Sequence, residues 1–189
     1  VGTDIPQAGD FDGDLKDDIA VFRPTGGMWF WQNSGNGQFG SIQFGQSGDL
    51  PVAGDYDGDG RDDVSVFRPS TGLWFRLNST GGFFSVGFGQ NGDMPVHADY
   101  DGDNREDIAV FRPTGGFWYR LNSTNGQFVA SQFGTNGDVP VPGDYDGDGR
   151  DDISVFRSGI WYLNRSTAGF QQVNFGLGSD IAIPAKYIP

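Results

Sequence analysis

Four short acidic segments carry most of the chemistry that this sequence could perform. They read GDFDGDLKDD from Gly9, GDYDGDGRDD from Gly54, ADYDGDNRED from Ala98 and GDYDGDGRDD from Gly143. Oxygen donors at alternate positions of a tight loop can wrap around calcium, a hard cation that takes six to eight oxygen ligands. The pattern therefore predicts four calcium sites, and Mg²⁺ is disfavoured because each loop offers so many protein oxygens.

Each loop supplies carboxylates at positions 1, 3, 5 and 9 and a backbone carbonyl at position 7, counted from its first Asp. The predicted side-chain ligands are Asp10, Asp12, Asp14 and Asp18; Asp55, Asp57, Asp59 and Asp63; Asp99, Asp101, Asp103 and Asp107; and Asp144, Asp146, Asp148 and Asp152. The predicted carbonyl ligands belong to Lys16, Arg61, Arg105 and Arg150.

The loops are not EF-hands, because position 12, where an EF-hand has a bidentate Glu, is a valine in all four copies: Val21, Val66, Val110 and Val155. Without that ligand we expect water in the coordination shell and a dissociation constant of about 10⁻⁴ to 10⁻³ M, which suits calcium levels outside cells. Position 6 calls for a left-handed backbone, which Gly60, Gly149 and Asn104 tolerate better than Leu15. We therefore expect the first site to be the weakest.

The net charge of −13 is mostly a consequence of these loops. Twenty of the 25 acidic residues lie in them, and the other five recur once per repeat, at Asp4, Asp49, Asp93, Asp138 and Asp180. Four divalent cations would bring the net charge to −5, an ordinary value for a soluble domain. A solvated acidic turn without metal is the alternative, but four crowded carboxylates would then repel one another in every loop.

The loops recur every 44 or 45 residues, so one structural unit has been copied. Each copy contains a DxPV segment, the loop, a DIAVFRP run, a GxWYRLNS run and an apolar stretch ending in FG, which predicts four strands and almost no helix. The expected fold is an all-β propeller of four four-stranded blades with an extra C-terminal strand. A linear solenoid is the competing geometry, but it normally has a shorter repeat and polar end caps.

We expect residues 1–189 to form a single propeller domain, with repeats at 4–47, 48–91, 92–136 and 137–178 and a partial fifth repeat at 179–189. Lys186 stands where a fifth loop would begin, so no fifth metal site follows. The spare segment could close the ring, pair with the exposed edge of a neighbouring molecule, or mark a longer propeller.

With the loops placed before a DIAVFRP strand, nearly the whole chain resembles the FG-GAP or VCBS-type repeats of integrin alpha-chain propellers and of many secreted bacterial proteins. The residues that carry the resemblance are the loops, the prolines Pro24, Pro69 and Pro113, and the pairs Phe44-Gly45, Phe88-Gly89, Phe133-Gly134 and Phe175-Gly176. The resemblance implies that the 16 loop aspartates named above hold calcium that rigidifies each blade. The family usually has seven blades and VGAP where this chain has VFRP, so a four-blade ring, an assembly of chains and a fragment all stay open.

Recurring aromatic and charged residues are best explained by packing. Trp29, Trp74, Trp118 and Trp161 occupy the same place in each repeat, which favours a role between blades over sugar binding. The recurrent Arg23, Arg68, Arg112 and Arg157 and the recurrent Asp residues outside the loops predict one ion pair per blade. Trp31 has no counterpart in the other repeats and is the one candidate ligand-binding residue.

We expect no enzymatic activity, because the single His97 and single Glu106 form no acid–base constellation and the paired aspartates all lie in metal loops. The expected function is that of a secreted, non-catalytic calcium-binding module in adhesion, partner binding or scaffolding, with structural calcium and a protein or glycan partner outside the cell. A lectin-like module, or an accessory domain of a polysaccharide-active enzyme, is the first alternative. A fibre or surface-layer subunit, forming homo-oligomers through the C-terminal strand, is the second. The acidity argues against nucleic acid, and no apolar run is long enough for membrane insertion.

Overall fold

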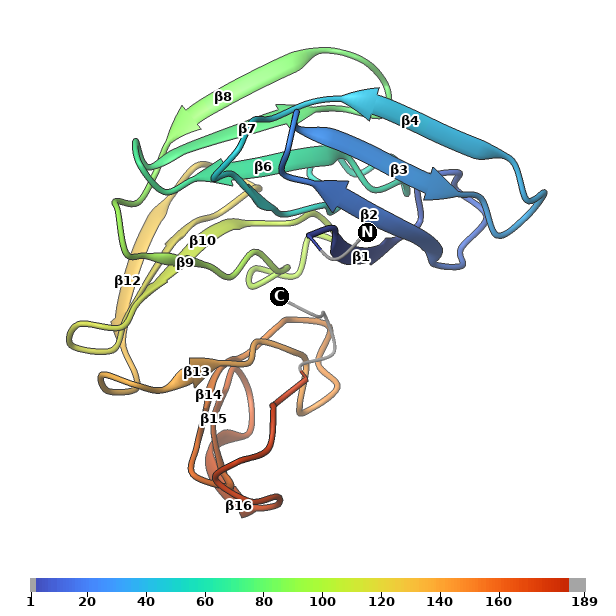
Figure 1. The fold of residues 1–189 in the computed structure, drawn as a ribbon. Helices are drawn as coiled ribbons and strands as arrows, with labels where there is room; N and C mark the ends of the chain where they lie inside the picture. Colours follow the sequence, from blue (N-terminus) through green and yellow to red (C-terminus); the bar gives the residue numbers. More distant parts are fainter. Residues whose placement is uncertain (1–2, 184–189) are drawn as a thin grey trace. The chain divides into compact units, whose positions relative to one another are not determined.

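The computed structural model describes residues 3–183, and these form sixteen β-strands and no helix. The strands make four antiparallel sheets of four strands, one for each predicted repeat (Figure 1). Blade 1 contains β1 (Ile5–Gly9), β2 (Asp18–Arg23), β3 (Met28–Gln32) and β4 (Phe39–Gln43), and blade 2 contains β5 (Leu50–Pro51), β6 (Val64–Arg68), β7 (Leu73–Leu77) and β8 (Phe83–Gly87). Blade 3 contains β9 (Met94–Pro95), β10 (Ile108–Arg112), β11 (Phe117–Leu121) and β12 (Phe128–Gln132), and blade 4 contains β13 (Val139–Pro140), β14 (Ile153–Arg157), β15 (Ile160–Arg165) and β16 (Gly169–Asn174).

The fold confirms the predicted all-β class and the four blades of propeller type. Neighbouring strands in the sequence are neighbours in each sheet, so short turns suffice to connect them. Since the described residues contain no helix, none of them forms a long apolar helix able to cross a membrane.

The chain divides into two compact units, and the boundary between Asn91 and Gly92 coincides with the predicted boundary between repeats two and three. The first unit contains blades 1 and 2, and the second contains blades 3 and 4. Each unit has its own buried apolar cluster: Phe22, Trp29, Val64 and Val66 in the first; and Val96, Ala98, Tyr100, Ala109, Phe111, Trp118, Ile153 and Val155 in the second. Both clusters draw residues from two blades, so each pair of blades shares its core.

In blade 2 both faces of the second strand are apolar and both are buried. Val66 and Phe67 point to opposite faces of β6 and are both fully buried. Phe67 pairs with Trp74 across the ladder, at 5.2 Å between ring centroids, and the indole Nε1 of Trp74 donates a hydrogen bond to the carbonyl of Phe88 at 2.8 Å. Trp29 and Trp118 are buried with the same hydrogen bond, so these two and Trp74 are packing residues, as predicted. Trp161 donates the equivalent bond to Phe175 but is only half-buried.

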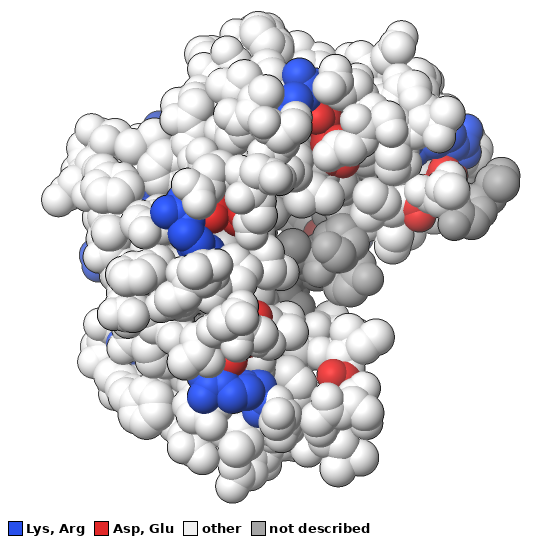
Figure 2. Space-filling view, turned by 60° about the vertical axis from the view of Figure 1, so that its left-hand side comes forward, with Lys and Arg blue, Asp and Glu red and all other residues white. Residues whose placement is uncertain are grey.

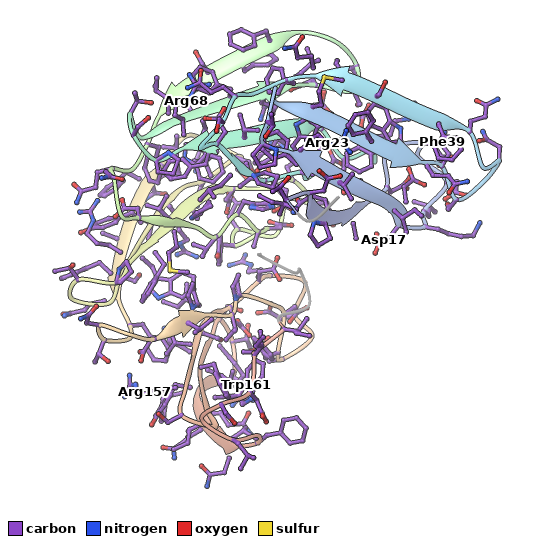
Figure 3. The ribbon with its side chains drawn as sticks, viewed as in Figure 1. Asp17, Arg23, Phe39, Arg68, Arg157 and Trp161 are labelled. Atoms are coloured by element: carbon purple, nitrogen blue, oxygen red, sulfur yellow. The ribbon has the colours of Figure 1, made fainter. Side chains whose placement is uncertain are left out.

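An Arg–Asp pair joins the beginning and the end of the first hairpin in every blade, as predicted. In blade 2 the guanidinium of Arg68 donates two hydrogen bonds to Asp49, at 2.7 and 2.9 Å, and lies over the ring of Phe75. The equivalent pairs are Arg23–Asp4, Arg112–Asp93 and Arg157–Asp138. On the face shown in Figure 2, blue side chains accordingly lie beside red ones on a mostly uncharged surface. The arginines Arg23, Arg68 and Arg157 are labelled in Figure 3.

The segment after the fourth blade is described only in part. The N–H of Leu177 donates to the Asp180 carboxylate at 2.9 Å, as the N–H of Gln46 does to Asp49 in the first repeat. Residues 179–183 lie outside the sixteen strands, and residues 184–189 of the predicted extra strand fall outside the described part of the chain.

Candidate metal centres

The first Asp of each loop organises the backbone that follows it. In loop 1 the carboxylate of Asp10 accepts hydrogen bonds from the N–H groups of Gly13, at 2.6 Å, and Leu15, at 2.7 Å. Asp55, Asp99 and Asp144 accept the equivalent pair of bonds in the other loops. This arrangement explains why the loop begins with Asp, since the side chain replaces a backbone acceptor and closes the turn.

Position 6 has the left-handed backbone that the sequence predicted. The φ angle is 66° at Leu15, 83° at Gly60, 63° at Asn104 and 84° at Gly149. Leucine carries a steric cost in this conformation that glycine avoids, so the strain is confined to the first loop and, to a smaller extent, the third.

The Asp at position 9 accepts hydrogen bonds from its own loop and from a neighbouring turn. Asp63 is fully buried, its Oδ2 accepts from the N–H of Tyr56 at 3.2 Å, and its Oδ1 accepts from the N–H of Ser79 at 2.8 Å. Asp18, Asp107 and Asp152 repeat both contacts. The carboxylate therefore ties the acidic loop to the turn between the third and fourth strands of its own blade.

The side chains of that turn also reach the loop, which the sequence did not reveal. Ser79 Oγ donates to Asp59 at 2.6 Å and Thr80 Oγ1 donates to Asp57 at 2.6 Å. Ser34, Ser123 and Ser166 bond the position-5 aspartates of their own loops in the same way. An Asn-Ser pair recurs after the third strand of the first three blades and could have indicated this contact. The aspartates that the serines contact lie 20 residues earlier in the chain, so no local pattern connects them.

Asn78, which begins an Asn-Ser-Thr glycosylation motif, also contacts the loop. Its Nδ2, the atom that a glycan would modify, donates to Asp57 at 2.8 Å, and the residue is buried. Asn78 is thus a part of the loop's support.

Three of the four predicted carboxylates come together in each loop, with one oxygen of each within 4.8 Å of the others. The groups are Asp10, Asp12 and Asp18; Asp55, Asp57 and Asp59; Asp99, Asp101 and Asp107; and Asp144, Asp146 and Asp152. The fourth predicted ligand of each loop, Asp14, Asp63, Asp103 or Asp148, lies outside its group of three and accepts the hydrogen bonds described above. Coordination by the carbonyls of Lys16, Arg61, Arg105 and Arg150 stays a prediction.

The electrostatics of the clusters fit a hard cation. Burial raises the pKa of Asp63 and of Asp107 to about 6, against the attraction of their backbone N–H partners. The Oδ1 atoms of Asp57, Asp101 and Asp146 are buried and accept no hydrogen bond from the described residues. Buried carboxylate oxygens normally have partners, and a divalent cation would satisfy them. All donors are oxygen, with no His or Cys in any group, which matches calcium rather than zinc.

The candidate ligand residue Trp31 lies on the face of blade 1 that packs toward blade 2, against the apolar cluster of the first unit. It stacks on Phe11, so it has a packing role, and ligand binding at Trp31 stays a prediction.

Four-stranded blades repeated along the chain, each with an acidic loop between its first and second strands, define a β-propeller repeat protein with four candidate metal sites. The FG-GAP-like repeat family matches residues 10–66 and 99–155, more than half of the chain, and the protein belongs to that family.

Solved structures share the fold at low sequence identity. A virginiamycin B lyase from Staphylococcus aureus has a TM-score of 0.59 and 11% identity, over 90% of this chain and 55% of its own. A streptogramin B lyase has a TM-score of 0.58 and 14% identity, over 93% of this chain and 55% of its own. A protein of unknown function from Bacteroides caccae has a TM-score of 0.58 and 10% identity, over 99% of this chain and 66% of its own. The chain thus spans little more than half the length of the two lyases, and no curated protein matches it.

Proposed function

We propose that this protein is a secreted, non-catalytic module in which four calcium ions rigidify the blades and the blade surfaces bind a partner or build a scaffold. The observation that carries the proposal is the position-3 aspartate of the last three loops, whose buried Oδ1 lacks a hydrogen bond within the described structure and lies in a group of three converging carboxylates. Calcium supplies charge neutralisation at such a site. The residues of the chain position the carboxylates. Asp63 and its equivalents join the loop to the turn between the third and fourth strands of the same blade. The Ser and Thr side chains of that turn orient the remaining carboxylates.

A structural role for calcium follows from where the loops lie. Each loop connects the first and second strands of a blade, and its last Asp begins the second strand or precedes it directly. A bound ion would therefore stabilise the hairpin that carries the buried Val66 and Phe67 or their equivalents. The non-catalytic proposal rests on the assignment of the clustered aspartates to metal binding and on the absence of a second set of converging acid–base groups in the sequence. The likeness to lyases concerns the fold alone at these identities.

The test is thermal unfolding in 10 mM calcium, in 10 mM magnesium and in excess chelator at matched ionic strength. We expect the melting temperature to rise with calcium and to change little with magnesium. Equal melting temperatures in all three solutions would refute a structural calcium role.

A glycan-binding role is the second candidate, and a groove of about 150 Å³ between blades 1 and 2 favours it. The groove is lined by Phe44, Phe75 and Phe83 together with Arg68, and Phe83 is largely exposed. Aromatic faces beside a guanidinium can stack on and hydrogen-bond a sugar. Retention of the protein on a glycan array, lost in Phe83→Ala, would support this role, and no retention at any glycan would exclude it.

A further inference from the structure

A buried asparagine lies beside the acidic loop in each of the first three blades. Asn33, Asn78 and Asn122 directly follow the third strand of their blades and begin the turn that contacts the loop. The side-chain oxygen Oδ1 of all three is buried and accepts no hydrogen bond from the described residues. Buried amide oxygens normally have a partner, so three equivalent exceptions need a common explanation.

Asn78 is the best-defined case, because its side chain contacts the acidic loop directly. The residue is only 7% exposed, and its Nδ2 donates to Asp57 Oδ2 at 2.8 Å. Asp57 belongs to the group of three converging carboxylates in loop 2. Its other oxygen, Oδ1, is also buried and accepts no hydrogen bond within the described part of the chain. Two side chains in contact at the candidate site therefore each carry an unsatisfied oxygen.

Holding Asp57 in place does not account for the Asn78 side chain. Thr80 Oγ1 donates to the same Asp57 Oδ2 at 2.6 Å, so this oxygen keeps a donor without Asn78. In blade 4 the equivalent Asp146 Oδ2 accepts instead from two backbone N–H groups of its turn, at 3.1 and 2.7 Å. A role confined to holding Asp57 would also leave the buried Oδ1 of Asn78 without a partner.

The burial of Asn78 limits the partner of its Oδ1 to something small. A side chain so little exposed cannot reach a sugar or a peptide on the surface, whereas a metal ion or a water molecule is small enough. The neighbouring carboxylates favour the cation. Calcium takes neutral Asn oxygens together with carboxylates, so the donor set fits this ion.

The amide of Asn78 can present either of its two atoms to Asp57. Rotation about its last side-chain bond exchanges Nδ2 and Oδ1 and leaves the rest of the side chain in place. A carboxylate by itself attracts the N–H group, but a carboxylate that shares a cation attracts the oxygen. Ligands stand about 2.3 to 2.6 Å from calcium, so two of them can lie as close together as Nδ2 and Asp57 Oδ2 do here, at 2.8 Å.

We propose that Asn78 Oδ1 is a further calcium ligand in loop 2, and that Asn33 and Asn122 supply the same ligand in loops 1 and 3. The inference rests on the calcium role proposed above and adds a neutral ligand from outside the loop. β6 and β7 are antiparallel, and Val64 at the start of β6 pairs with Leu77 at the end of β7. One ion would therefore join the two chain segments at the open end of this hairpin.

Blade 4 lacks this ligand. Arg165 stands where the other blades have asparagine, one residue before the serine that contacts the loop. Its guanidinium donates to the carbonyls of Gly169 and Ala168, at 3.0 and 3.2 Å, within its own turn. The acidic loops of blades 2 and 4 have the same sequence, GDYDGDGRDD, but different residues at this place in the turn. We therefore expect loop 4 to bind calcium more weakly than loop 2.

The first experiment changes Asn78 in two ways and follows calcium binding to the whole chain by calorimetric titration. Asn78→Leu removes both the oxygen and the N–H group at similar size, and we expect one of the four sites to lose affinity by about tenfold or more. Asn78→Asp loses the N–H donor but keeps an oxygen, so all four sites should keep their affinity. Equal losses in the two variants would overturn the proposal, because the site would then need the N–H group. An unchanged affinity in Asn78→Leu would overturn it as well.

A second measurement uses the intact chain and does not depend on the folding of a variant. In isotope-labelled protein, the side-chain carbonyl carbons of Asn33, Asn78 and Asn122 should shift in the NMR spectrum on calcium addition, because ligation polarises the C=O bond. Asn36 and Asn125 are exposed in the same turns and serve as internal controls whose signals should stay in place. If the Asn78 signal also stays in place, a water molecule and not the ion satisfies its oxygen, and the proposal is overturned.

Blade 4 allows the ligand to be added. Arg165→Asn should raise the calcium affinity of loop 4, and Arg165→Leu is the matched control because it removes the same charge without adding an oxygen. Equal effects of these two substitutions would count against the proposed ligand. An intact chain that binds no calcium would refute the calcium role itself, whereas calcium binding that is insensitive to residues 78 and 165 would refute only the inference about the turn asparagines.

Discussion

Trp31 stacks on Phe11, with the ring centroids 5.6 Å apart and the planes inclined by 27°. The equivalent pairs in the next two blades are an arginine over a tyrosine: Arg76 over Tyr56 at 5.3 Å and Arg120 over Tyr100 at 4.9 Å. Trp31 thus replaces a cation–π contact with an aromatic stack. The exchange requires Gly40 across the ladder, since a Cβ there would come within 2.1 Å of the indole.

This relationship predicts a strong coupling between positions 31 and 40. We expect Gly40→Val to destabilise the protein by about 1 to 3 kcal/mol, because the indole is rigid and must leave its place. In a Trp31→Arg background the same substitution should cost much less. Urea denaturation of the double-mutant cycle measures the coupling, and equal costs in both backgrounds would contradict the packing explanation.

Asp62 provides a prediction about communication between loops. The N–H of Asp10 in loop 1 donates to Asp62 Oδ2 in loop 2 at 3.2 Å. Asp62→Ala removes this acceptor, so we expect a loss of about 1 kcal/mol in the free energy of unfolding. It should also weaken calcium binding in loop 1, although Asp62 is not a predicted ligand. Calorimetric calcium titration and urea denaturation provide the readout.

The matched control for Asp62→Ala is Asp17→Ala. Asp17 holds the same loop position but is exposed, so its removal should leave stability and calcium affinity unchanged. Similar effects of the two substitutions would show that position 8 acts through net charge and not through the contact with the preceding loop.

The strained backbone at Leu15 predicts that a substitution there can increase the stability and calcium affinity of loop 1. Its φ of 66° is strained for leucine and its side chain is largely exposed, so Leu15→Gly should stabilise the folded protein by about 0.5 to 1 kcal/mol and raise calcium affinity in loop 1. Gly60→Leu in loop 2 is the reverse substitution, in open space at a φ of 83°, and should have the opposite effect. Urea denaturation at saturating calcium compares the two, and a loss of stability in Leu15→Gly would contradict the strain argument.

The raised pKa values of Asp63 and Asp107, about 6, predict an unusual pH dependence. Without calcium, the folded protein binds these protons more tightly than the unfolded chain, whose Asp pKa is about 3.9, so stability falls as pH rises from about 4 to about 6. Calcium requires the deprotonated carboxylates and should restore stability in that same window. The difference in melting temperature between calcium and chelator should therefore be larger at pH 7 than at pH 5. If the difference in melting temperature between calcium and chelator is the same at pH 5 and pH 7, this explanation is contradicted. It is also contradicted if the pH dependence of that difference is unchanged in the Asp63→Asn, Asp107→Asn double variant.

The sequence predicted what local spacing determines, and it missed what the stacking of strands and blades determines. The period, the strands, the Arg68–Asp49 type of pair and the left-handed position 6 were all predictable, because each repeats in a fixed register along the chain. The contact of Ser79 with Asp59 depends on the register of β6 and β7, and that of Asp62 with Asp10 depends on the docking of two blades 52 residues apart. Neither leaves a local pattern. The sequence showed that Trp31 has no counterpart in the other repeats. It did not show why a tryptophan fits there, because the residues that accommodate it, Phe11 and Gly40, lie in two other segments.

The most direct test of the central claim is the number of calcium ions that one chain binds, measured by calorimetric titration after exhaustive chelation. We predict four ions per chain, with a stabilisation of about 1.4 to 2.7 kcal/mol per site at 10 mM calcium for a dissociation constant of about 10⁻³ to 10⁻⁴ M. Asp57→Asn should reduce the number to three. A chain that takes up no calcium at 10 mM would contradict the claim that these four loops are calcium sites.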